Sequence, residues 1–293
     1  FPDAVGKAAS KLRGVAVGMV GSGHIPEVVV NQGFLKRFPS LEIVSSLGVG
    51  YDHIDAAAAA ECGVVVTHTP DVLNEEVADT AMGLLLATVR QFPQADRFVR
   101  AGKWLTEPFP LTATLRGRRM GILGLGRIGL AIAKRAEAFG VEVVYHNRNP
   151  RADLPYRHYA SLLEMARAVD ILMIVAPGGP ETQGIVDAEV LAALGPEGVL
   201  INASRGTLVD DKALIAALRE RTILTAGLDV FTHEPQVPEA LMAMDHIVLL
   251  PHLGSASTHT RNAMGQLVVD NLLHWFAGKG PITPVPETSS PRG

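Results

Sequence analysis

The sequence has few of the features that mark disulfide-linked, membrane-spanning or nucleic-acid-binding proteins. Its 293 residues include one cysteine, Cys62, which excludes an internal disulfide and suits a reducing compartment, the cytoplasm. We expect this residue to be buried as a small apolar side chain. No apolar run of about 18 residues is present to span a bilayer, and a net charge of −4 gives no basic field. Neither a nucleic acid nor a membrane is therefore an expected partner.

Glycine, by contrast, is abundant, and three of the 29 glycines have a specific spacing. Gly124, Gly126 and Gly129 lie in the stretch 119–134, where an apolar strand gives way to a helical pattern. The first permits a tight turn, the second lets the backbone approach phosphates, and the third lets the helix pack against the strand. Free amides at the positive end of that helix favour an anion. The spacing predicts a turn that receives the pyrophosphate of a dinucleotide.

The residues around this turn complete a nucleotide-binding unit. We expect Arg127 and Ile128, between the last two glycines, to take part in cofactor binding. A helix is predicted over 131–139, with Gly140 as its C-cap, and a parallel strand over 141–145. The turn therefore lies in a strand-helix-strand unit, and a redox enzyme is the leading hypothesis.

The end of the second strand of this unit indicates which cofactor is bound. An Asp or Glu there would accept hydrogen bonds from the 2'-hydroxyl of NAD, but the sequence has Asn147 and Arg148 instead. Arg148 can pair with a 2'-phosphate through its planar guanidinium, and Asn147 can donate as well. NADP(H) is therefore favoured, and NAD(H) stays possible. The alternative is that Arg148 and Arg151 are solvated loop charges.

The wider pattern predicts an α/β protein with two Rossmann-like domains, doubly wound parallel sheets and a cleft between the domains. A flavodoxin-like substrate domain is expected over 1–73 plus 270–293, and a dinucleotide-binding domain over 74–269. The chain opens on Phe1 near the end of a helix, so we expect the first strand of the substrate domain to be missing. One long helix over 74–100 would link the domains, another would cover 257–276, and 281–293 would be a mobile tail. The expected strands cover 15–20, 42–46, 64–67, 170–175, 199–202, 225–228 and 246–250, and the expected helices of the second domain cover 162–167, 188–194 and 211–219.

Polar residues that follow strands are candidates for chemistry, because ligands of such sheets bind outside the carboxyl ends of the strands. Three residues stand out. Arg205 follows the strand 199–202, Glu234 lies in the loop after 225–228, and His252 follows 246–250. All three come from different loops at one predicted edge of the sheet, as a converging site requires. No metal is expected in it.

Several motifs of the sequence resemble those of a known family. The chain resembles the D-isomer-specific 2-hydroxyacid dehydrogenases, and especially their glyoxylate and hydroxypyruvate reductase branch. Several independent motifs occur in the family's order. The matching stretches are 47–55, 77–81, 102–104, 124–129, 202–206, 227–231, 233–235 and 251–255.

The resemblance implies NAD(P)H-dependent reduction of a small 2-oxo acid to the D-2-hydroxy acid. Arg205 would hold the substrate carboxylate and carbonyl oxygen. His252 would be the general acid, with Glu234 on its other ring nitrogen. The backbone around Val49 and Gly50 would add amide donors to the substrate carboxylate.

The resemblance also implies cofactor contacts and an assembly. Asp229 would meet the nicotinamide carboxamide, Ala203 would contact the cofactor, and Thr80 would touch the nicotinamide side. The helix over 74–100 resembles the family's dimer arm, so a homodimer is expected.

Two departures from the family pattern and several alternatives remain. Asn147 and Arg148 replace the usual acid, which puts NAD in doubt, and the 177–180 loop, Pro-Gly-Gly-Pro, replaces a more common apolar and threonine-bearing loop. Phosphoglycerate, formate and phosphite dehydrogenases share the scaffold, although formate enzymes lack an acid at the position of Glu234. A nucleotide-sensing corepressor uses the same fold and can keep the Arg, Glu and His residues.

Overall fold

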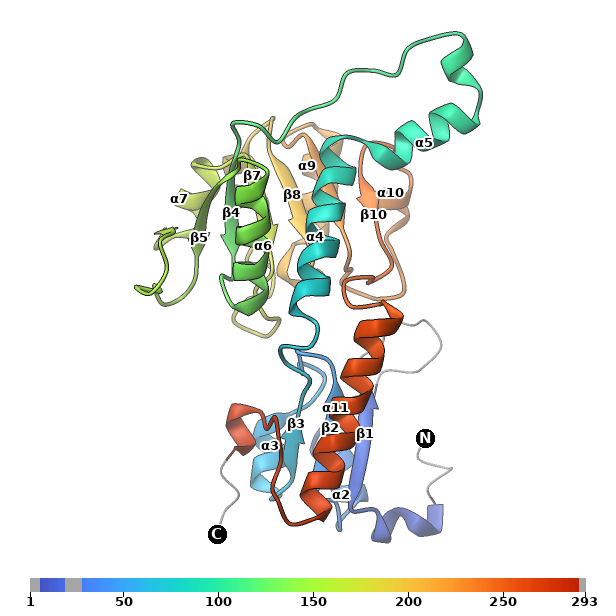
Figure 1. Cartoon of the computed structure of the whole chain (residues 1–293), viewed down its shortest axis with the longest axis vertical. Helices are drawn as coiled ribbons and strands as arrows, with labels where there is room; N and C mark the ends of the chain where they lie inside the picture. Colours follow the sequence, from blue (N-terminus) through green and yellow to red (C-terminus); the bar gives the residue numbers. More distant parts are fainter. Residues whose placement is uncertain (1–5, 19–27, 290–293) are drawn as a thin grey trace. The chain divides into compact units, whose positions relative to one another are not determined.

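The structure is a computed structural model that describes residues 6–18 and 28–289. The chain divides into two compact units (Figure 1). The first unit comprises Phe1–Leu73 and Ala256–Gly293, and the second comprises Asn74–Ser255. The expected boundary at 269/270 is therefore too far along the chain. Among the described residues, no helix combines the length and the apolar content needed to cross a membrane.

The first unit contains a three-stranded parallel sheet in the order β1-β2-β3. Apolar side chains of β2 and β3 are buried because helices and chain segments cover the sheet. The polar residues of the central strand are satisfied within the unit, where Ser45 Oγ accepts a hydrogen bond from Thr67 Oγ1 at 2.9 Å. The strands are β1 (Gly14–Gly18), β2 (Ile43–Leu47) and β3 (Val65–Thr67), and the helices are η1 (Gly6–Lys11), α2 (Gln32–Arg37), α3 (Ala56–Glu61), α11 (Thr258–Phe276) and η4 (Pro286–Thr288).

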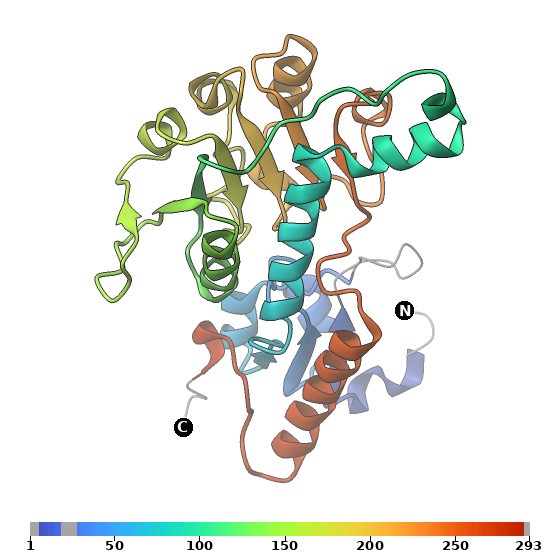
Figure 2. The same ribbon diagram turned by 45° about the horizontal axis from the view of Figure 1, so that its top comes forward.

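Helix α11 belongs entirely to the first unit, which explains why the predicted domain boundary was wrong. Ser257 caps the helix by accepting a hydrogen bond from the Thr260 amide, and the helix packs against β2 (Figures 1 and 2). Ser45 Oγ donates to the Val268 carbonyl at 3.2 Å. A buried contact to the central strand therefore assigns the whole helix to the first unit, and not only the part from residue 270.

The segment 281–289 is docked on β3, so the prediction of a mobile tail is wrong for these residues. Val285 is fully buried, and its amide donates to the Val66 carbonyl at 2.9 Å. Thr288 Oγ1 accepts from the Val66 amide at 3.0 Å and donates to the Val66 carbonyl at 3.2 Å. The last part of the predicted tail, 290–293, lies outside the described residues. Cys62 also differs from expectation, because it is exposed at the C-cap of α3.

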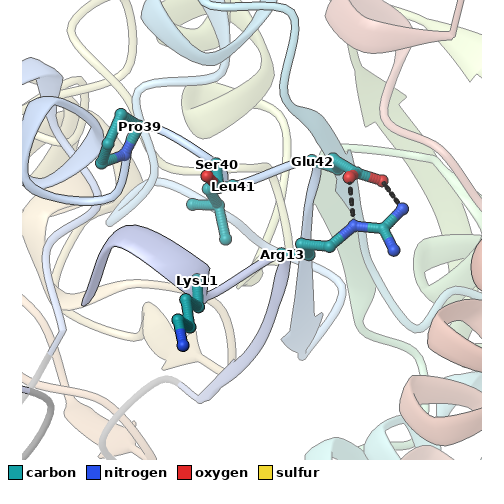
Figure 3. A pocket seen from close by; sticks show the side chains of 6 residues that line it. All are labelled: Lys11, Arg13, Pro39, Ser40, Leu41 and Glu42. Carbon is teal, nitrogen blue, oxygen red and sulfur yellow. Dashed lines mark hydrogen bonds and ion pairs between the residues drawn. The ribbon is translucent and has the colours of Figure 1, made fainter. Parts of the chain in front are cut away.

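An open cavity of about 580 Å³ lies beside the start of β1 and the residues before β2 (Figure 3). Arg13, one of two basic residues that line it, pairs with Glu42, and Trp275 Nε1 donates to the same carboxylate at 3.0 Å. The cavity lies at the amino ends of the strands, opposite the edge where such sheets bind ligands. It is lined by Lys11, Arg13, Pro39, Ser40, Leu41 and Glu42.

The second unit is a doubly wound α/β domain around a seven-stranded parallel sheet, as predicted. The strand order is β10-β9-β8-β7-β4-β5-β6, so the chain reverses direction across the sheet beside β4. β7, β8 and β9 are buried at every position because helices cover both faces. The strands are β4 (Arg119–Leu123), β5 (Glu142–His146), β6 (Arg157–His158), β7 (Ile171–Ile174), β8 (Val199–Asn202), β9 (Thr225–Leu228) and β10 (Val248–Leu249).

Helices cover the two faces of this sheet in separate apolar clusters. α4 and α6 lie side by side on one face, over the buried side chains of β4 (Figure 1). α7, α8 and α9 pack in the other cluster. The helices of the unit are α4 (Asn74–Val89), α5 (Phe92–Arg100), η2 (Lys103–Leu105), α6 (Arg127–Ala138), α7 (Leu162–Arg167), α8 (Ala188–Leu194), η3 (Gly206–Leu208), α9 (Asp211–Arg219) and α10 (Glu239–Met242).

The predicted helix over 74–100 is two helices, α4 and α5. The break is at Gln91, which has a left-handed φ of 52°. Pro93 follows in the first turn of α5, where a proline is tolerated because its missing N–H is not needed, whereas inside a continuous helix it would clash with the preceding turn. α5 buries none of its side chains within the described residues.

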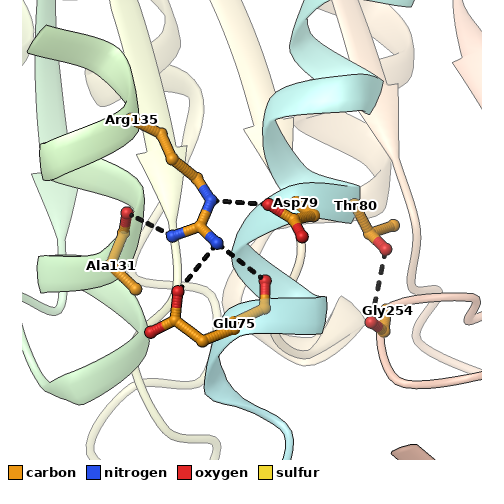
Figure 4. A network of polar contacts seen from close by, with 6 residues as sticks. All are labelled: Glu75, Asp79, Thr80, Ala131, Arg135 and Gly254. Atoms are coloured by element: carbon orange, nitrogen blue, oxygen red, sulfur yellow. Dashed lines mark hydrogen bonds and ion pairs between the residues drawn. The ribbon is translucent and has the colours of Figure 1, made fainter. Parts of the chain in front are cut away.

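A polar network fastens the first turns of α4 to α6 (Figure 4). Arg135 of α6 donates to Asp79 Oδ1 at 2.6 Å and to Glu75 Oε2 at 2.8 Å, and its remaining terminal nitrogen donates to the Ala131 carbonyl at 3.0 Å. Thr80, next to Asp79, donates to the Gly254 carbonyl at 3.3 Å. The start of α4 is thereby fixed beside the turn that follows β10.

Candidate active site

The glycine turn between β4 and α6 has the geometry of an anion-binding turn. Gly124 has a φ of 98°, and a Cβ added there would lie 2.5 Å from the Ala176 backbone. A Cβ on Gly129 would lie 2.5 Å from the Gly124 carbonyl oxygen. Gly126, the N-cap of α6, is different, because a Cβ there would meet no atom within 4 Å. The turn therefore needs glycine for close packing at two positions and leaves space at the third, in front of the helix amides.

The side chains of this turn occupy different environments. Arg127 is exposed at the start of α6, and Ile128 is partly buried against the apolar cluster under the helix. Asn147, at the end of β5, accepts from the Leu125 amide at 2.7 Å through Oδ1, and its Nδ2 is 3.5 Å from the Leu125 carbonyl. Asn147 thus holds the glycine turn, which is a different contact from the expected one to a phosphate.

Arg148 lies in the loop after β5 with a largely exposed side chain. Its Nη1 forms an ion pair with Glu181 Oε2, from the loop after β7. The 148 and 181 side chains are 82% and 74% exposed, so the guanidinium is accessible to a ligand but has an acidic partner. The sequence interpretation did not include Glu181.

Glu234 and His252 form a hydrogen-bonded pair across two loops. His252 Nδ1 lies 2.7 Å from Glu234 Oε2, and Glu234 Oε1 accepts from the Phe231 amide at 2.9 Å. An ionised carboxylate only accepts hydrogen bonds, so in this contact Nδ1 carries the proton. The two side chains are 22% and 20% exposed. The pair therefore fixes the imidazole and leaves Nε2 as its other reactive nitrogen.

Asp229, at the end of β9, holds the backbone of the His252 turn. Its carboxylate is buried and accepts from the Leu253 amide at 2.6 Å and from the Gly254 amide at 2.9 Å. The His252 amide donates to the Asp229 carbonyl at 2.8 Å. Burial raises the pKa of the Asp229 carboxyl, while these amide bonds and His252 act in the opposite direction. His252 itself has a φ of 54°, a left-handed conformation that the turn must maintain.

Arg205 follows β8 in a loop that a buried asparagine organises. Asn202 donates to the Arg205 carbonyl at 2.9 Å and accepts from the Ser204 amide at 3.1 Å. Arg205 Nη1 donates to the Ser204 carbonyl at 2.8 Å. Ala203, between Asn202 and Ser204, is partly buried at the end of the strand. Asn202 is not among the residues that the sequence predicts to support the site. Its signal in the sequence is a polar residue at the last position of a buried strand.

Gly206 joins the Arg205 loop to the Glu234 loop. A Cβ on Gly206 would lie 1.9 Å from the Phe231 carbonyl carbon and 2.2 Å from the Thr232 nitrogen. Only glycine allows this approach of the two backbones. The loops after β8, β9 and β10 therefore pack at one edge of the sheet, and they bring a guanidinium and an imidazole–carboxylate pair to that edge.

Val49 and Gly50 lie in the first unit, in the loop after β2. Both are partly buried. His68 Nδ1 is 2.9 Å from the Val49 carbonyl, and the Gly48 amide donates to Thr69 Oγ1 at 3.0 Å. Side chains that follow β3 thus hold this loop at the carboxyl ends of the strands.

The comparisons with known proteins agree with this geometry. The family model for the NAD binding domain of the D-isomer specific 2-hydroxyacid dehydrogenases matches residues 82–254. A glyoxylate/hydroxypyruvate reductase A of Arabidopsis thaliana is 51% identical over 86% of this chain and 80% of its own length. A hydroxyphenylpyruvate reductase of Plectranthus scutellarioides is 46% identical over 97% of this chain and 88% of its own length.

A solved structure extends the similarity to the whole fold. The NADPH-dependent glyoxylate/hydroxypyruvate reductase of Sinorhizobium meliloti, in complex with NADP and malonate, superposes with a TM-score of 0.94 at 51% identity. The match covers 100% of this chain and 90% of that chain. From its motifs, its fold and these similarities, the chain belongs to the D-isomer specific 2-hydroxyacid dehydrogenase family.

Proposed function

We propose that the protein uses NADPH to reduce a small 2-oxo acid, glyoxylate or hydroxypyruvate, to the D-2-hydroxy acid. The observation that carries the proposal is the Glu234–His252 pair, at the same sheet edge as Arg205. Reduction of a 2-oxo acid needs a cation for the carboxylate and a proton donor for the carbonyl oxygen. The names of the similar reductases support the same reaction.

His252 is the proposed general acid. Glu234 holds Nδ1, so Nε2 of the protonated ring gives its proton to the carbonyl oxygen as the carbonyl carbon is reduced. The product is an alcohol and a neutral imidazole, which takes up a proton from solvent before the next turnover. In the reverse direction the neutral ring removes the hydroxyl proton.

Arg205 is the proposed substrate anchor. A guanidinium binds a carboxylate through two parallel hydrogen bonds, which fixes the orientation of the adjoining carbonyl group. The buried Asn202 holds the Arg205 backbone and limits the positions that this cation adopts. We propose that the first unit is the substrate domain and that the backbone amides of Val49 and Gly50 in it bind substrate.

The second unit is the proposed dinucleotide-binding domain. Gly124, Gly126 and Gly129, with the first turn of α6 at Arg127 and Ile128, fit a pyrophosphate, because a turn that excludes side chains opens onto helix amides. When bound, NADPH supplies the hydride. Arg148 is the proposed partner of its 2'-phosphate, and Asn147 supports the turn. Ala203 and Asp229 are the proposed neighbours of the nicotinamide side.

A substrate panel with both cofactors tests the function. NADPH oxidation would be followed with glyoxylate, hydroxypyruvate, pyruvate and hydroxyphenylpyruvate, and then with NADH in place of NADPH. We expect the highest kcat/KM for glyoxylate or hydroxypyruvate with NADPH. Nucleotide binding without turnover of any 2-oxo acid would favour the sensor alternative and contradict the proposal.

A homodimer is also proposed, through the segment of α5 and η2. Within the described residues α5 buries none of its side chains, and large apolar side chains on and after it are exposed, among them Trp104 at 69% and Leu105 at 91%. Exposed apolar side chains so close in the sequence support an association surface here. Light scattering should give the mass of two chains, and Leu105→Ser should lower it. A monomer at micromolar concentration would contradict the proposal. The single cysteine supports the cytoplasm as the proposed location.

A further inference from the structure

The ion pair between Arg148 and Glu181 spans the carboxyl end of β4. Arg148 follows β5 and Glu181 follows β7, and these two strands flank β4 on opposite sides. The glycine turn begins at this end of β4. The pair therefore bridges the two loops at the point where the strand order reverses, which is where open α/β sheets bind their ligands.

Both partners project from backbone that other contacts hold. Asn147, next to Arg148, is fixed by Leu125, and its carbonyl is 3.0 Å from His158 Nε2. Thr182, next to Glu181, donates through Oγ1 to the Pro177 carbonyl at 2.9 Å, and its amide donates to the Gly179 carbonyl at 3.1 Å. The two side chains thus face each other from anchored positions.

We infer that Glu181 determines cofactor specificity and weakens the preference for a 2'-phosphorylated nucleotide. The inference rests on the proposed function, in which Arg148 binds the 2'-phosphate. The ion pair occupies Nη1 of Arg148, so Glu181 lies beside the guanidinium whose other nitrogens would bind the phosphate. Its carboxylate is then close to a phosphate that carries nearly two negative charges, and like charges at short range repel.

The effect on a cofactor with a 2'-hydroxyl is different. A hydroxyl is neutral and donates a hydrogen bond, which a carboxylate accepts. NAD-binding domains of this kind have an Asp or Glu at the end of the second strand, where this chain has Asn147 and Arg148. Glu181, in the loop after β7, supplies a carboxylate from the other side of β4. Glu181 therefore penalises NADPH and leaves NADH binding unchanged or favoured, which allows the protein to use both cofactors.

Glu181→Gln tests this inference because it removes the charge and keeps the shape. Dissociation constants of NADPH and NADH would be measured by fluorescence titration at low ionic strength, where exposed charges are least screened. We expect the variant to bind NADPH about two- to fivefold more tightly, the range of one exposed charge interaction. Its affinity for NADH should stay within about twofold or fall. Glu181→Asp keeps the charge, so its dissociation constant for NADPH should be close to that of the parent and higher than that of Glu181→Gln.

Glu197→Gln is the matched control. Glu197 is also a paired surface glutamate, 3.9 Å from Arg118 and 80% exposed, but it precedes β8 at the amino edge of the sheet. The control changes the net charge by the same amount as Glu181→Gln. Because it does so at the opposite edge of the sheet, it should leave both dissociation constants unchanged. An equal gain in NADPH affinity for both variants would show a general charge effect and overturn the inference.

Arg148→Ala separates the inference from the proposed function. If Arg148→Ala weakens NADPH selectively but Glu181→Gln changes neither cofactor, the Glu181 inference fails and the proposed function stands. If Arg148→Ala weakens NADPH and NADH equally, the 2'-phosphate assignment fails and the inference fails with it.

Discussion

His252 Nδ1 lies 2.7 Å from Glu234 Oε2, and the other oxygen of the same carboxylate accepts the Phe231 amide. The backbone thus holds the Glu234 carboxylate, and the carboxylate holds the imidazole. This chain of contacts explains how a histidine in a left-handed turn keeps one orientation without packing deeply into the core.

Glu234→Gln should reduce turnover while leaving the fold intact. The amide keeps the shape of the side chain but no longer stabilises a positively charged imidazole, so proton donation becomes less favourable. We expect kcat to fall about 10- to 100-fold and the NADPH dissociation constant to stay within about twofold. An unchanged kcat would show that the carboxylate has no part in proton transfer.

Arg205→Lys should damage substrate binding more than cofactor binding. Lysine keeps the charge but loses the planar pair of donors that grips a carboxylate. We expect kcat/KM for hydroxypyruvate to fall about 100-fold, with unchanged NADPH affinity in a fluorescence titration. The assignment would be wrong if both affinities fell together.

The glycine turn allows a contrast between two substitutions of the same size. Gly129→Ala places a methyl group 2.5 Å from the Gly124 oxygen and should destabilise the protein by about 1–3 kcal/mol. Gly126→Ala meets no protein atom within 4 Å and should leave the Tm nearly unchanged, yet it should weaken NADPH because the methyl group lies where the phosphates approach. Equal nucleotide affinity in Gly126→Ala and the parent would exclude this turn as the pyrophosphate site.

The docked C-terminal segment makes a testable contribution to stability. Thr288→Val keeps the volume but removes the hydroxyl that pairs with both polar groups of the Val66 backbone. A buried amide without a partner costs about 1–3 kcal/mol, so the Tm should fall. Ser289→Ala is the control, because the Ser289 hydroxyl donates to the Pro286 carbonyl at an exposed position. Equal Tm values for the two variants would indicate that the segment adds nothing to stability.

The elements of the second unit follow closely from the sequence where apolar runs are fully buried. The strands at 199–202 and 225–228 and the helices at 162–167, 188–194 and 211–219 have the predicted bounds. Local pattern suffices there because burial on both faces or on one stripe leaves few alternatives. The pattern over 74–100 predicts one helix where the structure has α4 and α5, and Pro93 in the first turn of α5 is the sequence signal for the break.

Contacts between residues far apart in the sequence could not be predicted from the local sequence pattern. The proline-rich segment at 281–289 carries no strand or helix signal, and its order depends on contacts with β3 such as those of Val285 and Thr288. The pairing of Arg148 with Glu181 likewise depends on β7 lying next to β4. The site roles of Arg205, Glu234 and His252 stay predictions, while the contacts that hold these residues are structural observations.

The most direct test of the account is the turnover of His252→Gln with NADPH and hydroxypyruvate or glyoxylate, measured alongside NADPH affinity. The account predicts a fall in kcat of about 100- to 10,000-fold, because the ring nitrogen that donates the proton is absent, with a dissociation constant for NADPH within about twofold of the parent. A variant that keeps kcat within a few-fold of the parent would contradict the assignment of His252 as the proton donor.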